Sequence, residues 1–468
     1  MPDRDHPLKP DSYRERLLDH KISQLLGIST SIDLRGARGA GKTWCALAHA
    51  KSIVSADDET IAMPLIQMDA RIALTGPRPH AVDEWAAFPD LMRQAAKASK
   101  TPGSFLLLTS CEPTREADVR GAKPAGVAGA ARTRLRMRTL ALAERGLSSR
   151  AVSLGDLVSS GGTWPPLASR EKAARASGQL AGDVAPVGAS GQAGEAPTND
   201  HARAGLGSLG LYACEGGWAA AAARSHEDAL VIARNQVDSL LAGDVRRQGR
   251  KESVARAILA CVELATGGDT SYASLAERAA EAGLDFPSRN TLGSYARTFE
   301  QLYLLERLPG WAAPVRSASR VKTKPRLVVA DPSLGVMAAG LGPRDLAQNA
   351  AWLGAAFRAL ALHDLLAYAE ALPSELDARV CYYADADGLS VDAVLLLGGD
   401  GWAPVCLAMR EGDAPAAIRR LARLERKVAA GGSTLGGPAF KLVVTPGGTP
   451  WRDERTGTVV APVTSLTA

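Results

Sequence analysis

The 468-residue sequence predicts an α/β fold: a parallel sheet near the N-terminus, an all-α unit after it, and a small α/β domain at the C-terminal end. The first observation is that helix-like stretches separate four short apolar segments that we expect to be strands, which is typical of a parallel sheet: 29–34, 61–68, 80–83 and 104–110. The second is that residues 253–308 have the helix lengths and turn of a helix-turn-helix. The third is that strand-like segments return at 379–410 and 439–445 around a helix at 414–430.

The composition restricts the class of protein. The chain has 55 basic and 50 acidic side chains, and the net charge of +5 is too small to indicate a nucleic-acid-binding protein. Its six cysteines are scattered without a CxxC or CxxH pair, which argues against zinc and against a disulfide framework. A reducing, cytoplasmic location is the simplest expectation. The sequence lacks a run of eighteen apolar residues and its start is too polar for a signal peptide, so we expect no membrane partner.

A glycine-rich loop follows the first expected strand. Residues 36–43, GARGAGKT, form a complete GxxxxGK[ST] pattern, and SIDL and TWCALAHAKSI supply the flanking strand and helix. Glycines let backbone N–H groups approach phosphate oxygens, Lys42 reaches the β- and γ-phosphates, and the Thr43 hydroxyl ligates Mg²⁺. An ordinary glycine-rich loop is the alternative, which this context disfavours. With ATP and Mg²⁺ as cofactors, the expected nucleotide-binding residues are Gly36, Ala37, Arg38, Gly39, Ala40, Gly41, Lys42 and Thr43.

Such a loop needs a second acid for the metal and a group that positions water. In HAVDEW, Asp83 would hold Mg²⁺ and Glu84 would activate the attacking water, although acidic pairs at strand ends are also common as solvated pairs. Thr109 and Ser110 end the strand FLLLTS, where a hydroxyl would touch the γ-phosphate or the water. We choose Thr109 for this role. A helix N-cap before Glu112 is the alternative.

Three N-terminal segments resemble those of a widespread group of bacterial and archaeal AAA-superfamily P-loop ATPases: LRGARGAGKTW, HAVDEWAAFPDLMRQAAKASKTPGSFLLLTS and ARTRLRMRTLAL. In that family the C-terminal domain of unknown function combines a winged helix with a restriction-endonuclease-like fold. Four C-terminal segments occur in the family's order: YARTFEQLYLLERLPGW, KPRLVVADPSLG, AAWLGAAFRALALHDLL and LSVDAVLLL. The resemblance implies nucleotide binding by the glycine-rich loop and Walker B roles for Asp83 and Glu84.

Composition shifts and this resemblance together divide the chain. Residues 159–205 are rich in Gly, Ala, Ser and Pro and cannot bury enough apolar surface to fold, so we expect a linker there. The expected segments are a P-loop AAA-type ATPase domain at 1–158, a flexible low-complexity linker at 159–205, a helical lid or connector at 206–252, a winged helix-turn-helix at 253–345 and a degenerate restriction-endonuclease-like domain at 346–468.

Four alternate arginines follow the sheet segments, at a position where the family has a similar arginine-rich strand: Arg132, Arg134, Arg136 and Arg138. One of them would act as an arginine finger on the γ-phosphate, in cis or from a neighbouring subunit, because a guanidinium matches the charge that develops there. We choose Arg132. The alternative, favoured for most of the four, is the solvated face of a strand that buries Leu135 and Met137.

The nuclease-like part departs from the family pattern, which often has a helix glutamate, an acidic pair in a strand and ExK in the next strand. Here Arg358 replaces the glutamate, Ser390 precedes Val391 and Asp392, and residues 408–410 read AMR. Metal-dependent phosphodiester cleavage needs two or three converging carboxylates and a lysine. Only Asp392 remains, so we expect no nuclease activity.

Basic residues on the expected recognition helix and wing favour a DNA or protein partner. A wing with several cations would contact phosphates and make binding salt-sensitive. Winged helices are also frequent protein-interaction modules, and the net charge is small. The residues expected to contact duplex DNA are Arg289, Arg297, Arg320, Lys322 and Lys324.

Together these features lead us to expect a cytoplasmic ATPase whose nucleotide state controls a C-terminal DNA- or protein-binding module, alone or as an oligomer. A regulator that binds ATP without hydrolysing it is the alternative. A small-molecule kinase fits the DEW segment and the long winged-helix tail poorly.

Overall fold

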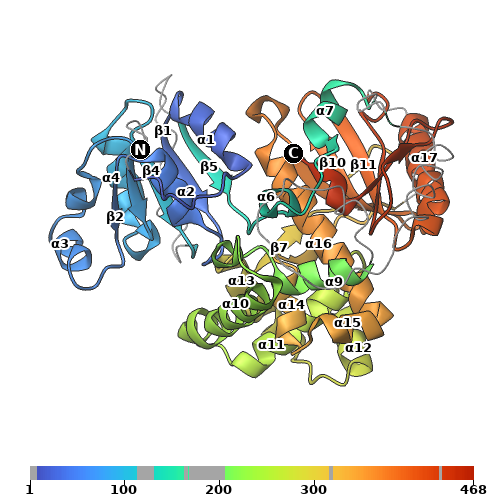
Figure 1. Cartoon of the computed structure of the whole chain (residues 1–468), viewed down its shortest axis with the longest axis horizontal. Coiled ribbons are helices and arrows are strands. Elements are labelled where there is room, and N and C mark those ends of the chain that lie inside the picture. Colours follow the sequence, from blue (N-terminus) through green and yellow to red (C-terminus); the bar gives the residue numbers. More distant parts are fainter. Residues whose placement is uncertain (1–7, 113–130, 163–166, 168–205, 316–319, 432–434) are drawn as a thin grey trace, which may run out of the picture. The chain divides into compact units, whose positions relative to one another are not determined.

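The structure, a computed structural model, describes residues 8–112, 131–162, 167, 206–315, 320–431 and 435–468 (Figure 1). The chain divides into two compact units, each assembled from three segments. Unit 1 consists of Met1–Leu140, Gly216–Ile258 and Asp285–Glu306, and unit 2 of Ala141–Glu215, Leu259–Leu284 and Arg307–Ala468. Most of the linker expected at 159–205 lies outside the described residues.

Unit 1 contains a five-stranded sheet in the order β2-β3-β4-β1-β5 in which all neighbours are parallel. Its strands are β1 (Ser29–Arg35), β2 (Ser52–Ser55), β3 (His80–Asp83), β4 (Phe105–Thr109) and β5 (Ala131–Arg136). All seven residues of β1 are buried, as expected for a central parallel strand covered on both faces. The predicted parallel α/β sheet is therefore confirmed.

Short helices accompany this sheet (Figure 1). They are α1 (Leu18–Leu26), α2 (Lys42–His49), α3 (Ala62–Met68), η1 (Ala70–Leu74), η2 (Trp85–Ala87) and α4 (Asp90–Ala98). Helix α1 buries Leu18, Ile22 and Leu25, which recur at helical spacing on one face.

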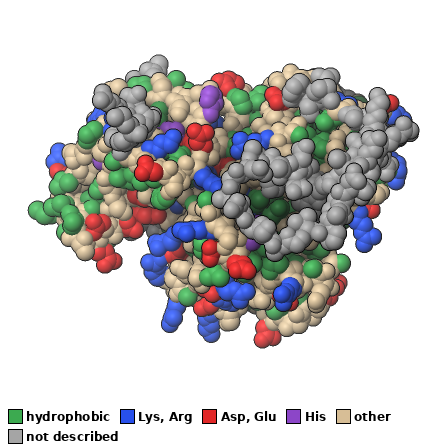
Figure 2. All heavy atoms as spheres, in the orientation of Figure 1, with side chains coloured by type: hydrophobic (Ala, Val, Ile, Leu, Met, Phe, Trp, Pro, Cys, Tyr) green, Lys and Arg blue, Asp and Glu red, His purple; other side chains and the backbone are tan. Residues whose placement is uncertain are grey.

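The strand expected at 61–68 is wrong, because this segment forms helix α3. Pro64 lies in its first turn, where a missing N–H is tolerated, whereas a proline would interrupt a central strand. Ala62 and Ile66 are buried at i, i+4 spacing. Three other apolar side chains of the segment, Ile61, Leu65 and Met68, stay exposed, and Figure 2 shows apolar surface over this helix.

Two later segments complete unit 1. The first contains η4 (Ala219–Ala221), α10 (His226–Ser239), the π-helical turn η5 (Leu240–Val245) and the start of α11 (Glu252–Leu264); the second contains α13 (Arg289–Gln301). The chain leaves unit 1 for the last time within β7 (Leu305–Leu308).

Unit 2 contains a mixed six-stranded sheet in the order β13-β14-β12-β11-β10-β9. Its strands are β9 (Arg379–Ala384), β10 (Ser390–Leu397), β11 (Gly401–Leu407), β12 (Leu442–Thr445), β13 (Trp451–Arg452) and β14 (Val459–Pro462). Helix α17 (Ala414–Ala430) packs against it through Ile418, Leu421 and Leu424, which join a core that includes Trp402.

Unit 2 also contains short strands and further helices: α6 (Leu142–Arg145), β6 (Val152–Ser153), α7 (Leu154–Ser159), α9 (Leu206–Glu215), α12 (Tyr272–Glu281), β8 (Arg326–Val329), α14 (Ser333–Ala338), α15 (Pro343–Gln348), α16 (Ala350–Ala371) and β15 (Leu466–Thr467). Among the described residues, α16 alone is long and apolar enough to cross a membrane. It packs against α9, α15 and β9, and 67% of its most apolar window is buried, as in the core helix of a folded domain.

Candidate nucleotide-binding site

The loop between β1 and α2 has the conformation that its glycines allow. Gly39 and Gly41 have φ angles of 87° and 94°, which side chains other than glycine rarely adopt. A Cβ atom on Gly36 would collide with the backbone carbonyl of Met137. Gly41 is also the N-cap of α2, so the loop leads into a helix N-terminus whose free N–H groups favour an anion.

Lys42 lies inside this loop with almost no solvent exposure. Its Nζ atom donates hydrogen bonds to the carbonyl oxygens of Gly36 (3.0 Å) and Ala37 (3.1 Å). Burial lowers the pKa of this ammonium group to about 8, although the carboxylates of Glu84 and Asp83 oppose the shift. A buried ammonium group that binds only carbonyl oxygens is poised to gain a stronger anionic partner.

Thr43 and Asp83 meet at the carboxyl end of the sheet. The Thr43 hydroxyl donates a hydrogen bond of 2.6 Å to Asp83 Oδ2, which joins the first turn of α2 to the last residue of β3. The two oxygens come from residues forty positions apart. Hydroxyl and carboxylate oxygens are hard ligands suited to Mg²⁺.

Glu84 directly follows β3 and adopts a left-handed conformation with a φ angle of 48°. Its carboxylate accepts hydrogen bonds from the Ser110 backbone N–H (3.0 Å) and hydroxyl (2.5 Å). The chosen Thr109 is fully buried, and its hydroxyl donates instead to the carbonyl of Cys111 at 2.8 Å. The structure therefore brings Ser110, and not Thr109, into contact with Glu84.

The choice of Arg132 as a γ-phosphate contact does not agree with the strand register. Arg132 pairs with Ser31 near the start of β1, whereas Arg136 pairs with Arg35, the last residue before the loop. Four residues of strand separate the two positions by about 13 Å. Arg136 stacks on Tyr303, with its guanidinium carbon 4.1 Å from the ring centroid, and is the arginine of β5 at the carboxyl edge of the sheet, where the glycine-rich loop begins.

The segment before α1 also supports the loop, a role that sequence patterns did not reveal. The Arg16 side chain donates hydrogen bonds of 2.8 Å to the carbonyl oxygens of Ala40 and Arg138. The Arg16 backbone N–H in turn donates to Asp19 at 2.7 Å. Arg16 therefore connects the loop to α1 and to the segment that follows β5.

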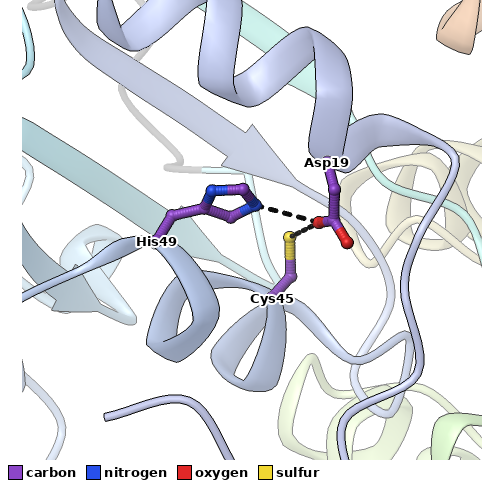
Figure 3. Close-up of side chains that lie close together, drawn as sticks. All are labelled: Asp19, Cys45 and His49. Atoms are coloured by element: carbon purple, nitrogen blue, oxygen red, sulfur yellow. Dashed lines mark hydrogen bonds and ion pairs between the residues drawn. The ribbon is translucent and has the colours of Figure 1, made fainter. Parts of the chain in front are cut away.

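Asp19, Cys45 and His49 form a cluster in which Cys45 and His49 project from α2 toward Asp19 of α1 (Figure 3). Their possible ligand atoms lie within 4.8 Å of one another, the spacing of a metal site. The carboxylate of Asp19, however, is already bound by the Tyr13 hydroxyl (2.8 Å), the Arg16 N–H and the His49 ring (2.9 Å). Hydrogen bonding thus accounts for the cluster, which fastens α1 to α2.

Residues from the segment 216–258 cover the loop. The Ala219 N–H donates to the Gly39 carbonyl at 3.1 Å, and the Gln236 side chain donates to the Arg38 carbonyl at 3.1 Å. The Arg38 guanidinium lies 3.4 Å from Asp244 of η5. Because these partners are about two hundred residues from the loop in sequence, no local pattern identifies them.

The residues expected to contact DNA are exposed but belong to different units. Arg289 and Arg297 lie on α13 in unit 1, and Arg320, Lys322 and Lys324 precede β8 in unit 2.

Eight chains of known structure resemble this one, and three of them are described here, all with low TM-scores. The Walker-type ATPase of Pyrococcus abyssi aligns with a TM-score of 0.37 and 10% identity over 72% of this chain and 99% of that chain. The Aeropyrum pernix ORC2 protein in ADPNP and ADP complexes aligns with a TM-score of 0.29 and 13% identity over 76% of this chain and 98% of that chain. The Aeropyrum pernix ORC1 protein in complex with DNA aligns with a TM-score of 0.25 and 15% identity over 70% of this chain and 93% of that chain.

A family model described as a domain of unknown function (DUF8612) matches residues 207–345. No curated protein matches the sequence. The matched region runs from α9 into α15 and leaves out the glycine-rich loop, so functional conclusions depend on the residues of the site.

Proposed function

We propose that the protein is an ATPase that binds ATP with Mg²⁺ through residues 36–43. The observation that carries this proposal is the convergence of Lys42, the Thr43–Asp83 pair and Glu84 at one edge of a parallel sheet. The backbone cradle and the buried ammonium group suit the β- and γ-phosphates. Thr43 and Asp83 supply the oxygen ligands that Mg²⁺ prefers.

Each residue then has a definite task. Lys42 neutralises phosphate charge, and Thr43 and Asp83 hold the metal, which when bound offsets the charge of the phosphate oxygens. Glu84 accepts a proton from the attacking water. In the structure each oxygen of its carboxylate accepts one hydrogen bond from Ser110, which competes with the water for Glu84, although each oxygen keeps a second lone pair.

A path of contacts within unit 1 supports the proposal that nucleotide state acts on α13. Two residues beyond Ser110, Glu112 pairs with Arg35 of β1 and accepts a hydrogen bond of 2.8 Å from the Tyr303 hydroxyl. The Glu112 N–H donates to the carbonyl of Gln301, the last residue of α13, at 2.8 Å. A change at Glu84 would therefore reach α13 and the DNA or protein partner that we propose for it, in a cytoplasmic setting.

Two variants test the assignment. Lys42→Ala should abolish binding of a fluorescent ATP analogue, because the buried cation is lost. Glu84→Gln should retain binding and lose at least about a hundredfold in turnover, the usual contribution of a general base. Glu59→Gln changes an exposed carboxylate outside the site and should behave as wild type. Normal hydrolysis by either site variant would refute the assignment.

The engagement of both Glu84 oxygens by Ser110 favours one alternative, a regulator that binds ATP without hydrolysing it. Single-turnover measurement with excess enzyme separates the two functions. Conversion of bound ATP to ADP that depends on Glu84 supports the ATPase, whereas ATP that remains intact supports the regulator.

A further inference from the structure

Unit 2 contains a group of basic side chains around one carboxylate. Three arginines, from β8, α16 and α17, act electrostatically on Asp392 of β10, and a fourth, from α12, acts on the arginine of α16. We call these four the arginine cluster: Arg278, Arg326, Arg358 and Arg420. All four are partly exposed, so the cluster is open to solvent.

The turn at residues 266–268 holds three of these arginines close together. Arg358 Nε donates to the Thr266 carbonyl at 2.8 Å, and Arg326 Nη1 donates to the Gly267 carbonyl at 3.2 Å. A Cβ on Gly268 would lie 3.5 Å from an Arg278 nitrogen, and one on Gly267 would lie 3.5 Å from Asp392 Oδ1. The turn therefore leaves guanidinium groups and the carboxylate side by side.

The positive charge of the cluster is not balanced. Among the described residues, none of the four guanidinium groups lies within 4.0 Å of a carboxylate oxygen. Asp392 acts electrostatically on Arg326 and Arg358, and Asp269 also acts on Arg326. The Oδ2 atom of Asp392 accepts a hydrogen bond of 2.9 Å from the Leu407 N–H. Within the described part of the chain, the buried Nε atom of Arg278 has no hydrogen-bond partner. Buried donors are normally satisfied, so Arg278 keeps an unused donor within the cluster.

The same residues exclude a metal centre here. Arg358, expected in place of a helix glutamate, directs Nη1 to the sulfur of Met409 at 3.4 Å and acts electrostatically on Asp392. One carboxylate among four cations cannot hold Mg²⁺. The arrangement suits an anion with several acceptor oxygens, because a guanidinium group pairs well with phosphate.

A basic segment leads into the cluster. Arg320, Lys322 and Lys324 are exposed and precede Arg326 at alternate positions. Lys322 and Lys324 act electrostatically on Asp269, which adjoins the turn at 266–268. A row of cations that ends in an arginine cluster suits a chain of phosphates better than a single phosphate.

We propose that the arginine cluster binds a backbone phosphate of duplex DNA, and that the basic segment 320–326 binds the neighbouring phosphates. The cluster acts as a binding site without cleavage. This inference is independent of the ATPase assignment, because every residue it uses lies in unit 2.

The test measures anisotropy of a labelled duplex of random sequence with the full-length Lys42→Ala protein, without nucleotide. Arg358→Gln and Arg420→Gln should each weaken binding at least about tenfold, the cost of a charge-assisted hydrogen bond, and should reduce the salt dependence by about one phosphate contact. Arg379→Gln is the matched control, since Arg379 is exposed and pairs with Asp377 in the same unit.

Two further measurements keep the proposal falsifiable. Arg420→Lys keeps the charge and should retain most of the affinity, and thermal denaturation should show that every variant is folded. Unchanged duplex affinity in the folded Arg358→Gln and Arg420→Gln proteins would overturn the proposal. If these variants lose affinity for inorganic phosphate but not for the duplex, the ligand is a small phosphate compound and the DNA assignment is wrong.

Discussion

Burial changes the charge state of Lys42, the residue that we propose to bind the phosphates. Its pKa of about 8 means that the free site loses its positive charge at mildly alkaline pH. Bound phosphate would raise this pKa again, so nucleotide binding takes up a proton. We expect the affinity for ATP to fall as the pH rises from about 8 to about 10, by up to about tenfold per pH unit.

Isothermal titration in buffers of different ionisation enthalpy measures this proton uptake directly. A Lys42→Arg protein that still binds ATP is the control, because arginine stays charged throughout this range. A wild-type affinity that is constant between pH 8 and about 10 would show that Lys42 does not meet the phosphates.

Asp19 joins α1 to α2 just behind the loop. Burial alone would raise its pKa, but hydrogen bonds from His49, the Arg16 N–H and Tyr13 outweigh this and hold the pKa below its ordinary value. The stabilisation is therefore present above the ordinary carboxyl pKa of about 4 and is lost as the pH falls through the lowered value. Asp19→Asn should lower the free energy of unfolding by about 1–3 kcal/mol at neutral pH.

Thermal unfolding of wild type and Asp19→Asn, measured from neutral pH down to the lowered pKa of Asp19, checks the direction of this pH dependence. The difference between their midpoints should shrink as the pH falls. Tyr13→Phe removes one donor and should show a smaller effect at neutral pH. A difference between wild type and Asp19→Asn that is constant with pH would contradict the role of the carboxylate charge.

At the scale of elements, local patterns predicted most of the site. The GxxxxGKT pattern and the DE pair at the end of β3 indicated Lys42, Thr43, Asp83 and Glu84, because a glycine-rich turn and a strand end can be recognised from neighbouring residues. Residues 61–68 were predicted as a strand and not as helix α3, because their apolar content was given more weight than the presence of Pro64. Two features could not be predicted from neighbouring residues, because they depend on contacts between distant parts of the chain. One is the register between β1 and β5, which places Arg136 and not Arg132 next to the loop. The other is the contact of Gln236 with the loop.

The contacts of the segment that follows β4 with α13 can be tested. Glu112 joins Arg35, Tyr303 and the end of α13, two residues from Ser110. We expect ATP to change hydrogen exchange of the α13 amides in the wild type, and Glu112→Gln to reduce this change. Tyr303→Phe removes one of these contacts and should have an intermediate effect. An equal ATP response in all three proteins would show that another path reaches α13.

For the whole molecule, the important feature is that the candidate nucleotide site is built from distant parts of the chain. The sequence predicts an ATPase domain that ends at 158, whereas unit 1 also includes Gly216–Ile258 and Asp285–Glu306. A fragment of residues 1–158 would lose the hydrogen bonds of Ala219 and Gln236 to the loop and the ion pair of Arg138 with Glu306.

We therefore expect the 1–158 fragment to bind an ATP analogue at least about tenfold more weakly than the full chain, because each lost hydrogen bond costs about 1 kcal/mol and exposes buried partners. It should also unfold at a lower temperature. A full-length Gln236→Ala protein loses one of these contacts and not the whole segment. Its affinity for the ATP analogue should lie between those of the fragment and the full chain. If the fragment binds and unfolds like the full chain, the boundary at 158 is correct and the later segments are dispensable for the nucleotide site.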